Sequence, residues 1–198
     1  MASSDASDTM QYTRFSIQGL VLVTPKRFGD ARGWFAETFR LQEFREEVAD
    51  VTFVQDNMSL SAEAGTVRGL HYQSPPHAQG KLVGVVRGAV TDVAVDARRG
   101  SPTFGEHVAV ELSVETGVQL WVPEGFLHGF ATLAPDTVVA YKVTDTYAPD
   151  CDGNVAWDDP DLAIDWGINA GTAVLSDKDR AALRWSEWKS PFAMETAT

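Results

Sequence analysis

The chain has 198 residues, a formal net charge of −12 and one cysteine, and 44% of its residues are hydrophobic while 22% are charged. This composition indicates a globular protein, and the length favours one large domain. The acidic balance argues against general binding to nucleic acids or to anionic membranes, because both need a basic surface. The single cysteine, Cys151, permits no intramolecular disulfide and favours a cytoplasmic location.

The beginning of the chain is predicted to be a flexible tail of residues 1–12, followed by a single domain of residues 13–198. The first ten residues, MASSDASDTM, lack the basic start and the apolar run of a signal peptide. No segment approaches the ~20 consecutive apolar residues that cross a membrane.

Short alternating runs separated by turn signals extend from residue 19 to about residue 150. The run AVTDVAVDA, residues 89–97, separates its valines from Asp92 and Asp96, and EHVAVELS, residues 106–113, alternates in the same way. A period of two is typical of a half-buried strand, so Asp92 and Asp96 are expected on a polar face.

Helical patterns are few. LQEFREEVAD, residues 41–50, has apolar residues near helical spacing, and SDKDRAALRW, residues 176–185, begins with the possible N-cap Ser176. Many short strands with a few short helices, mainly near the C-terminus, predict an all-β antiparallel sandwich or barrel of the jelly-roll type. Such a barrel can hold a ligand inside.

The four histidines are candidate functional groups. His107 falls on the polar side of its strand and His77 lies in a loop, so neither is expected to be catalytic. His71 and His128 lie in apolar surroundings, GLHYQ and GFLHGF, where a histidine is either a hydrogen-bonded core residue or a functional group. A metal site is disfavoured, because the chain has no H-x-H pair and no other ligand spacing.

The remaining chemistry is proton transfer. Nucleophilic hydrolysis is disfavoured, because there is no G-x-S-x-G sequence and Cys151 lies in the acidic loop APDCDGN. Proton transfer needs a base, a group that orients the base, an acid, and a cation for a developing oxyanion. His71 is a candidate base, and Lys81 or Arg68 is a candidate cation.

Spacing along the strands bears on which side chains can meet. Tyr141 and Tyr147 are six residues apart, so on a continuous strand they share a face and can enter one cavity, although strand tyrosines also form aromatic cores. Arg68 and His71 are three apart, which sends them to opposite faces of a flat strand. Gly69 between them predicts a bulge that brings both to one pocket.

Eight stretches occur in a recognisable order within residues 19–180. They are FGDARGWFAETF (28–39), FVQDNMS (53–59), RGLHYQ (68–73) followed by QGKLV (79–83), DVAVDARRGSPTFG (92–105), QLWVPEGFLHGF (119–130), YKVTDTYAP (141–149), WDDPDLAIDW (157–166) and LSDKD (175–179). In this order they resemble the dTDP-4-dehydrorhamnose 3,5-epimerase family and its sugar-epimerase relatives.

The resemblance implies a cupin-like jelly-roll barrel, usually a homodimer, that acts on a dTDP-linked 4-keto-6-deoxy sugar without a metal or other cofactor. It implies that His71 is the base, paired with Asp179, and that Tyr141 is the acid. It also implies that Lys81 helps to hold the sugar oxygen that becomes an enolate. It places eight further residues at nucleotide and sugar contacts: Phe28, Arg32, Glu37, Gln55, Asn57, Arg68, His128 and Tyr147.

Several alternatives stay open. The motifs do not decide between inversion at carbons 3 and 5, which is the leading expectation, and inversion at carbon 3 alone, as in relatives from antibiotic deoxysugar pathways. A ketoisomerase is disfavoured because such relatives tend to lack the arrangement of His71 and Asp179, and a non-catalytic sugar-binding barrel is the rival of another class. Gly84 departs from the larger residue expected there. The tail RWSEWKSPF, residues 184–192, is expected to cover apolar core rather than the pocket or a dimer interface.

Overall fold

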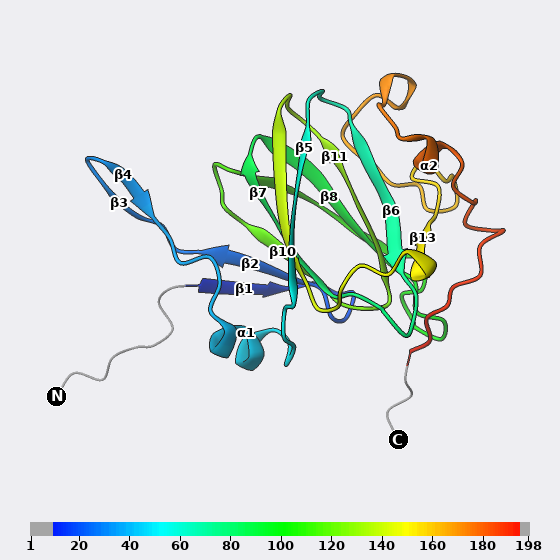
Figure 1. Cartoon of the computed structure of the whole chain (residues 1–198), viewed down its shortest axis with the longest axis horizontal. Coiled ribbons are helices and arrows are strands. Elements are labelled where there is room, and N and C mark those ends of the chain that lie inside the picture. Colours follow the sequence, from blue (N-terminus) through cyan, green and yellow to red (C-terminus); the bar gives the residue numbers. More distant parts are fainter. Residues whose placement is uncertain (1–9, 195–198) are drawn as a thin grey trace.

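The computed structural model describes residues 10–194, which form two antiparallel β-sheets packed face to face (Figure 1). The six-stranded sheet contains, in spatial order, β1 (Met10–Arg14), β2 (Val21–Pro25), β10 (Gln119–Val122), β7 (Lys81–Arg87), β12 (Thr137–Val143) and β5 (Gln55–Ser61). The five-stranded sheet contains β13 (Asp152–Asn154), β6 (Val67–Gln73), β11 (Phe126–Thr132), β8 (Ala89–Asp96) and β9 (His107–Ser113). The predicted all-β, cupin-like jelly-roll architecture is confirmed.

The main core lies between the two sheets. Val85 from β7, Val90 from β8 and Leu120 from β10 belong to one buried cluster that takes side chains from both sheets. Burying a side chain of this size stabilises the fold by roughly 1.5–3 kcal/mol. The inner faces of the sheets therefore supply much of the stability and also form the walls of any interior cavity.

Both outer faces of the barrel are covered in part. The helix α1 (Leu41–Glu47) buries Phe44 against Trp121 on the six-stranded sheet, with 5.3 Å between the ring centroids. Residues 185–192, which we name the C-terminal strap, bury Trp188 and Phe192 on the outside of the five-stranded sheet. The expectation that this tail covers apolar core is confirmed.

The prediction that residues 89–97 form a half-buried strand is wrong about burial. Asp92 and Asp96 have 0% exposure, because β8 lies between β11 and β9 in a sheet that is covered on both faces. Both aspartates share the inner face of β8 with Val90 and Ala94. The polar side of this run is thus the inside of the barrel.

The predicted N-terminal tail of residues 1–12 extends too far toward the domain. Residues 10–12 begin β1, in which Met10 pairs with Pro25 and Tyr12 pairs with Val23 of β2. Met10 is buried in the cluster under α1, and this burial holds the strand to the sheet. The rest of the predicted tail, residues 1–9, lies outside the described residues.

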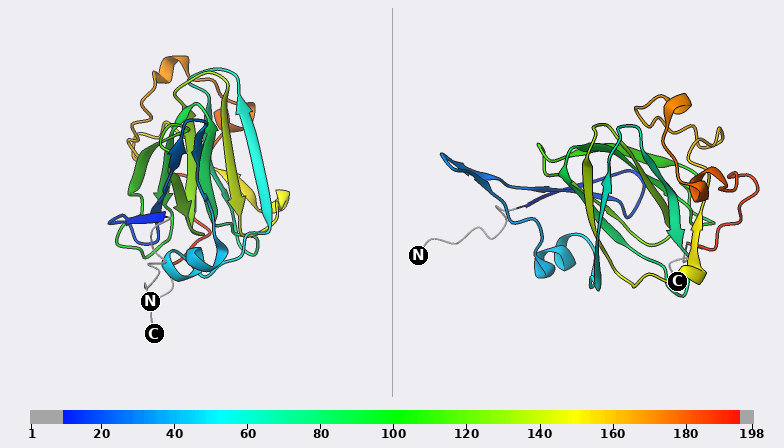
Figure 2. Two further views of the ribbon diagram at one scale, coloured as in Figure 1. Left: turned by 90° about the vertical axis from the view of Figure 1, so that its left-hand side faces the viewer. Right: turned by 45° about the horizontal axis from the view of Figure 1, so that its top comes forward.

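A hairpin of β3 (Phe28–Asp30) and β4 (Gly33–Phe35) projects away from the barrel (Figures 1 and 2). Its turn is closed by Arg32, whose backbone N–H donates to the Asp30 carboxylate at 2.8 Å. Its three aromatic side chains are exposed, Phe28 by 48%, Trp34 by 55% and Phe35 by 69%. Aromatic side chains gathered on a projecting hairpin are typical of an interaction surface.

The remaining helical segments are short. The expected C-terminal helix is the single turn α2 (Asp177–Arg180), in which the N-cap Ser176 accepts a hydrogen bond from the Asp179 N–H at 3.1 Å. Two 3-10 turns, η1 (Pro149–Cys151) and η2 (Ala170–Thr172), precede it. Within residues 10–194, no helix is long and apolar enough to span a membrane.

Candidate functional site

The predicted bulge at Gly69 is confirmed. His71 pairs with His128 of β11 whereas Arg68 pairs with Phe130, so Gly69 and Leu70 together oppose a single residue of β11, Gly129. A Cβ built on Gly69 would lie only 2.6 Å from the Gly129 Cα, so the two backbones approach as only glycines allow.

The bulge changes which face each residue of β6 presents. Val67 and Leu70 both pack in the outer cluster of the five-stranded sheet. Their neighbours Arg68 and His71 therefore both face the inside of the barrel, although they are three residues apart. Arg68 donates hydrogen bonds to the Ser61 hydroxyl and to the Leu60 carbonyl oxygen on β5.

His71 and Asp179 form a hydrogen-bonded pair. The distance from His71 Nε2 to Asp179 Oδ1 is 2.5 Å, and the Asp179 side chain is 3% exposed. Burial raises the pKa of Asp179, but the hydrogen bonds from His71 and Ser176, together with the His71 charge, outweigh burial and lower it. The ionised carboxylate orients the imidazole through Nε2, so Nδ1 is the nitrogen that can take up a proton.

A cavity of about 240 Å³ opens beside His71. Five other predicted site residues line this cavity with His71: Gln55, Asn57, Lys81, Tyr141 and Tyr147. Five further residues complete its lining: Tyr72, Gln73, Gln79, Asp152 and Lys178. Side chains from β5, β6, β7 and β12 therefore meet at one point inside the barrel, as the resemblance implied for six of the predicted residues.

Lys81 supplies a positive charge to this cavity. Burial lowers its pKa to about 8, while the nearby carboxylates of Asp152 and Asp92 act in the opposite direction. The ammonium is therefore mostly charged at neutral pH. It can stabilise an anion that forms in the cavity.

Tyr141 faces the same cavity with a neutral phenol. Burial raises its pKa, although the nearby charge of Arg68 partly opposes this effect. Tyr147 reaches the cavity by another route than predicted, because β12 ends at Val143 and Tyr147 lies in the following loop. This loop is held in place where the Tyr147 backbone N–H donates to Gln55 Oε1 at 3.1 Å.

His128 on β11 is the cross-strand neighbour of His71 on β6. It is buried, and its Nε2 lies 3.0 and 3.1 Å from the two carboxylate oxygens of Asp92. His128 and Arg68 are not part of the lining of the cavity, although His128 pairs with His71, which is. The buried carboxylate of Asp92 is near Lys81 as well, since it raises the pKa of that lysine.

The structure does not bring three predicted contacts to this cavity. Phe28 and Arg32 lie on the projecting hairpin, where they line a separate hollow with Trp34. Glu37 follows the hairpin and forms an ion pair with Arg40 at 2.8 Å. Within one chain these residues do not reach the His71 cavity, because the hairpin points away from the barrel (Figure 2). Their role as nucleotide or sugar contacts stays a prediction.

Asp152 and Lys178 are site residues that the sequence analysis missed. Their side chains form an ion pair at 2.5 Å, and the Tyr147 hydroxyl donates to the same Asp152 oxygen at 3.3 Å. Asp152 follows Cys151 in an acidic loop, which gives no sign of burial. Lys178 stands next to Asp179 in the LSDKD stretch, and that position was the available signal.

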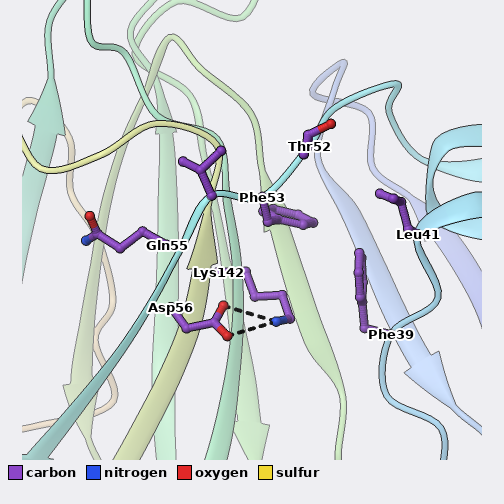
Figure 3. Close-up of a pocket in the computed structure, with 8 residues that line it drawn as sticks. Phe39, Leu41, Thr52, Phe53, Gln55, Asp56 and Lys142 are labelled. Atoms are coloured by element: carbon purple, nitrogen blue, oxygen red, sulfur yellow. Dashed lines mark hydrogen bonds and ion pairs between the residues drawn. The ribbon is translucent and has the colours of Figure 1, made fainter.

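A second pocket, of about 280 Å³, lies on the outer face of the six-stranded sheet beside α1 (Figure 3). Phe39 and Phe53 line it, and Lys142 Nζ pairs with Asp56 at 3.0 Å at its edge. Lys142 follows Tyr141 on β12, so the two side chains point to opposite faces of the sheet. This pocket is therefore separate from the His71 cavity.

A larger hollow of about 560 Å³, which we name the outer groove, lies on the same face between the sheet and the hairpin. Trp34 from the hairpin and Met58 and Val86 from the sheet line it. Gly84 lines this groove rather than the His71 cavity. The missing side chain at this position therefore affects the outer face of the barrel.

Comparison with known proteins agrees with the fold. A family model described as dTDP-4-dehydrorhamnose 3,5-epimerase matches residues 14–187. A dTDP-4-dehydrorhamnose 3,5-epimerase from Sinorhizobium fredii is 56% identical over 172 residues, which cover 87% of this chain and 88% of the relative. A 3-epimerase from Streptomyces niveus is 36% identical, with 90% of this chain and 85% of the relative covered.

Solved structures agree as well. The 3,5-epimerase RmlC from Legionella pneumophila, in complex with dTDP-4-keto-L-rhamnose, is 44% identical with a TM-score of 0.89, covering 95% of this chain and 100% of that one. NovW, a 4-keto-6-deoxy sugar epimerase from Streptomyces spheroides, is 36% identical with a TM-score of 0.84, covering 90% and 88%. Both the sequence relatives and the structures cover nearly the whole barrel, and the chain belongs to the dTDP-4-dehydrorhamnose 3,5-epimerase family.

Proposed function

We propose that this protein is an isomerase that epimerises a dTDP-linked 4-keto-6-deoxy sugar, inverting carbon 3 and carbon 5. The observation that carries the proposal is the 2.5 Å contact between His71 and Asp179 at the cavity that Lys81 and Tyr141 also line. These residues are a base with its orienting carboxylate, a cation and an acid, which are the groups that proton transfer next to a carbonyl requires.

The chemistry follows from the acidity of the sugar. The carbonyl at carbon 4 acidifies the hydrogens on carbons 3 and 5. In the proposal, His71 Nδ1 removes such a hydrogen, and the electron pair moves onto the carbonyl oxygen to give an enolate. The Lys81 ammonium stabilises this oxyanion with help from His128, and Tyr141 returns a proton to the opposite face of the ring. Gln55, Asn57, Arg68 and Tyr147 would hold the nucleotide and the sugar.

Inversion at carbon 3 alone is the second candidate. The 36% identity to the Streptomyces niveus protein, which is named a 3-epimerase, favours keeping it. The same base, cation and acid can serve one centre or two, because the outcome depends on how the enolate is turned toward Tyr141. The proposal includes a cytoplasmic location, which the free thiol of Cys151 fits.

Hydrogen exchange in heavy water tests the function directly. The purified protein is incubated with dTDP-4-keto-6-deoxyglucose, and deuterium at carbons 3 and 5 is followed by NMR. Label at both carbons with an L-configured product is the expected result. Label at carbon 3 alone would establish the single-centre candidate. Label at neither carbon would reject an epimerase for this sugar and favour a non-catalytic sugar-binding barrel.

The rate is predicted to fall as the pH rises through about 8, because the pKa of Lys81 lies at about 8. Burial lowers the pKa of Lys81 into this range. The ammonium is present below this pKa and is lost above it, so the enolate loses its cation at higher pH. Lys81→Arg keeps its charge to higher pH and should remove this alkaline limb, even if its maximal rate is lower. The measurement is kcat/KM as a function of pH, because this parameter reports the pKa values of the free enzyme. An identical limb in Lys81→Arg would contradict the assignment.

We also propose a homodimer in which the hairpin of one copy completes the cavity of the other. The cavity of about 240 Å³ is smaller than the ~300–1,000 Å³ typical of ligand pockets. The exposed hairpin aromatics and Arg32, which have no place beside His71 in their own chain, would supply the missing wall and a phosphate contact. The outer groove with its exposed Met58 and Val86 fits burial against a second copy.

Mixing two inactive variants tests this arrangement. If each site combines His71 of one copy with Arg32 of the other, a mixed dimer of His71→Asn and Arg32→Ala has one intact site. After subunit exchange, the mixture should regain up to about a quarter of the wild-type activity, because half of the dimers are mixed. His71→Asn mixed with Lys81→Met is the control and should regain none, since both residues come from the same copy. No recovery in either mixture would contradict the shared site.

A further inference from the structure

The C-terminal strap contacts a residue that lines the His71 cavity. The Trp188 Nε1–H donates a hydrogen bond to Tyr72 Oη at 2.9 Å, and the two ring centroids are 5.3 Å apart. Phe192 packs edge-on against the same ring at 5.8 Å. Tyr72 follows His71 in β6, and its ring packs with the outer cluster while His71 faces inward. The strap therefore packs against the outer face of β6, the strand that carries His71.

Tyr72 in turn holds the short edge strand β13. Tyr72 pairs with Gly153 in the sheet, and a Cβ built on Gly153 would lie 2.4 Å from both Tyr72 Oη and Cζ. The ring thus lies directly over the backbone of Gly153, in space that a side chain would fill. With three residues and one neighbouring strand, β13 has few ladder hydrogen bonds of its own. The Tyr72 ring is a second restraint on it.

β13 is bonded to α2. Asp152 pairs with Lys178 Nζ at 2.5 Å, and Asn154 Nδ2 donates to the Lys178 carbonyl oxygen at 2.9 Å. Lys178 directly precedes Asp179, the partner of His71. A displacement of β13 would therefore move Asp179 relative to the imidazole that it orients.

We propose that the C-terminal strap is a positioning element for the His71–Asp179 pair. Trp188 and Tyr72 are the positioning residues, and they act through β13 and α2. Trp188 itself does not contact the substrate. The kinetic consequence rests on the proposed function. Displacement of a catalytic group by ~1 Å can reduce a rate by about 10²-fold, so a partly loosened pair should lower kcat by less than that.

Trp188→Phe tests the proposal because it keeps an aromatic ring and removes the N–H donor. We expect kcat to fall roughly tenfold while KM stays within about twofold, since ground-state contacts are retained. The matched control is Trp185→Phe. Trp185 packs between Phe104 and Trp188, at 5.0 and 5.3 Å, one layer farther from the cavity. It should lose a similar amount of thermal stability with kcat unchanged. Equal kcat in the two variants would overturn the proposal.

A double-mutant cycle separates this link from general loss of packing. Tyr72→Phe removes the acceptor of the same hydrogen bond, so it should lower kcat about as much as Trp188→Phe. The double variant should then fall no further than either single variant. Losses in kcat that simply multiply would show that Trp188 and Tyr72 act separately and would overturn the proposal.

A measurement without substrate tests the role of the strap independently of the proposed function. The short bond to Asp179 should shift the His71 Nε2–H proton resonance downfield in the NMR spectrum. Trp188→Phe should weaken or move this resonance, and Trp185→Phe should not. An unchanged resonance in Trp188→Phe would overturn the proposal. If the wild-type protein exchanges no hydrogen in its substrate, the proposed function fails, while this resonance still decides whether the strap positions Asp179.

Discussion

Replacing His71 with asparagine is expected to abolish deuterium exchange at carbon 3 and to reduce kcat by roughly 10²–10⁴-fold, the usual contribution of a general base. Asparagine is smaller than histidine, so the site can accommodate it, but it takes up no proton and lacks an atom at the position of the Nε2 that contacts Asp179. Binding of dTDP should stay nearly unchanged, because the nucleotide contacts lie elsewhere. The measurements are NMR exchange with the sugar substrate and a binding titration with dTDP.

Tyr141→Phe is the matched control for this prediction. It keeps the base and removes the acid, so loss of hydrogen from carbon 3 should continue while net inversion slows. The rate of hydrogen exchange at carbon 3 in Asp179→Asn should lie between the rates of the two variants. This variant retains the imidazole but removes the charge that orients it. Continued exchange in His71→Asn at the wild-type rate would reject His71 as the base.

Replacing Asp96 with asparagine is expected to lower the free energy of unfolding by about 3–5 kcal/mol, as for other buried ion pairs that lose one partner. The Asp96 side chain is 0% exposed and accepts from the Arg98 guanidinium at 2.7 and 2.8 Å. It also accepts from Ser101 at 2.6 Å and from Thr103 at 2.7 Å. Asparagine leaves Arg98 without its counter-charge. Urea unfolding at constant m-value measures the effect, and Ser101→Ala, which removes one of these bonds, should cost only about 1 kcal/mol.

The pH dependence gives this prediction a second test. Burial raises the pKa of Asp96, but the hydrogen bonds from Arg98, Ser101 and Thr103 outweigh it and lower the pKa from 3.8 to about 2. The stabilisation is therefore complete above pH 3.8 and is lost as the pH falls through about 2. The difference in stability between wild type and Asp96→Asn should therefore shrink at low pH. A constant difference down to that pH would show that the charge of Asp96 is not the cause.

The strands were predictable, but their burial was not. Alternation identifies a strand from neighbouring residues, so the runs that form β8 and β9 could be recognised. Whether a polar face meets water depends on what covers it, and the inner face of β8 is covered by strands from distant parts of the sequence. Asp92 and Asp96 therefore resembled surface residues although both are fully buried.

The site shows the same division between local and distant information. Gly69 predicted the bulge because the spacing of Arg68 and His71 required one. Asp152 was missed because a charged loop gives no sign of its place in the fold, and Lys178 was missed although it stands beside Asp179 in the sequence. Phe28 and Arg32 were predicted by resemblance to contact the nucleotide or the sugar, but one chain does not hold them beside His71. The proposed second copy is an arrangement that no spacing within a single sequence expresses.

The close contact of Gly69 with Gly129 limits how this enzyme can diversify. A Cβ on Gly69 would meet the Gly129 Cα at 2.6 Å, and a Cβ on Gly129 would meet the Gly69 Cα at 2.8 Å. Neither glycine can accept a side chain while the other stays in place, and no change at one position makes room for a change at the other. The angle at which His71 enters the barrel is thus locked during evolution. We expect new substrate preferences to arise elsewhere in the lining of the cavity, for example on β13, where side chains can be exchanged one at a time.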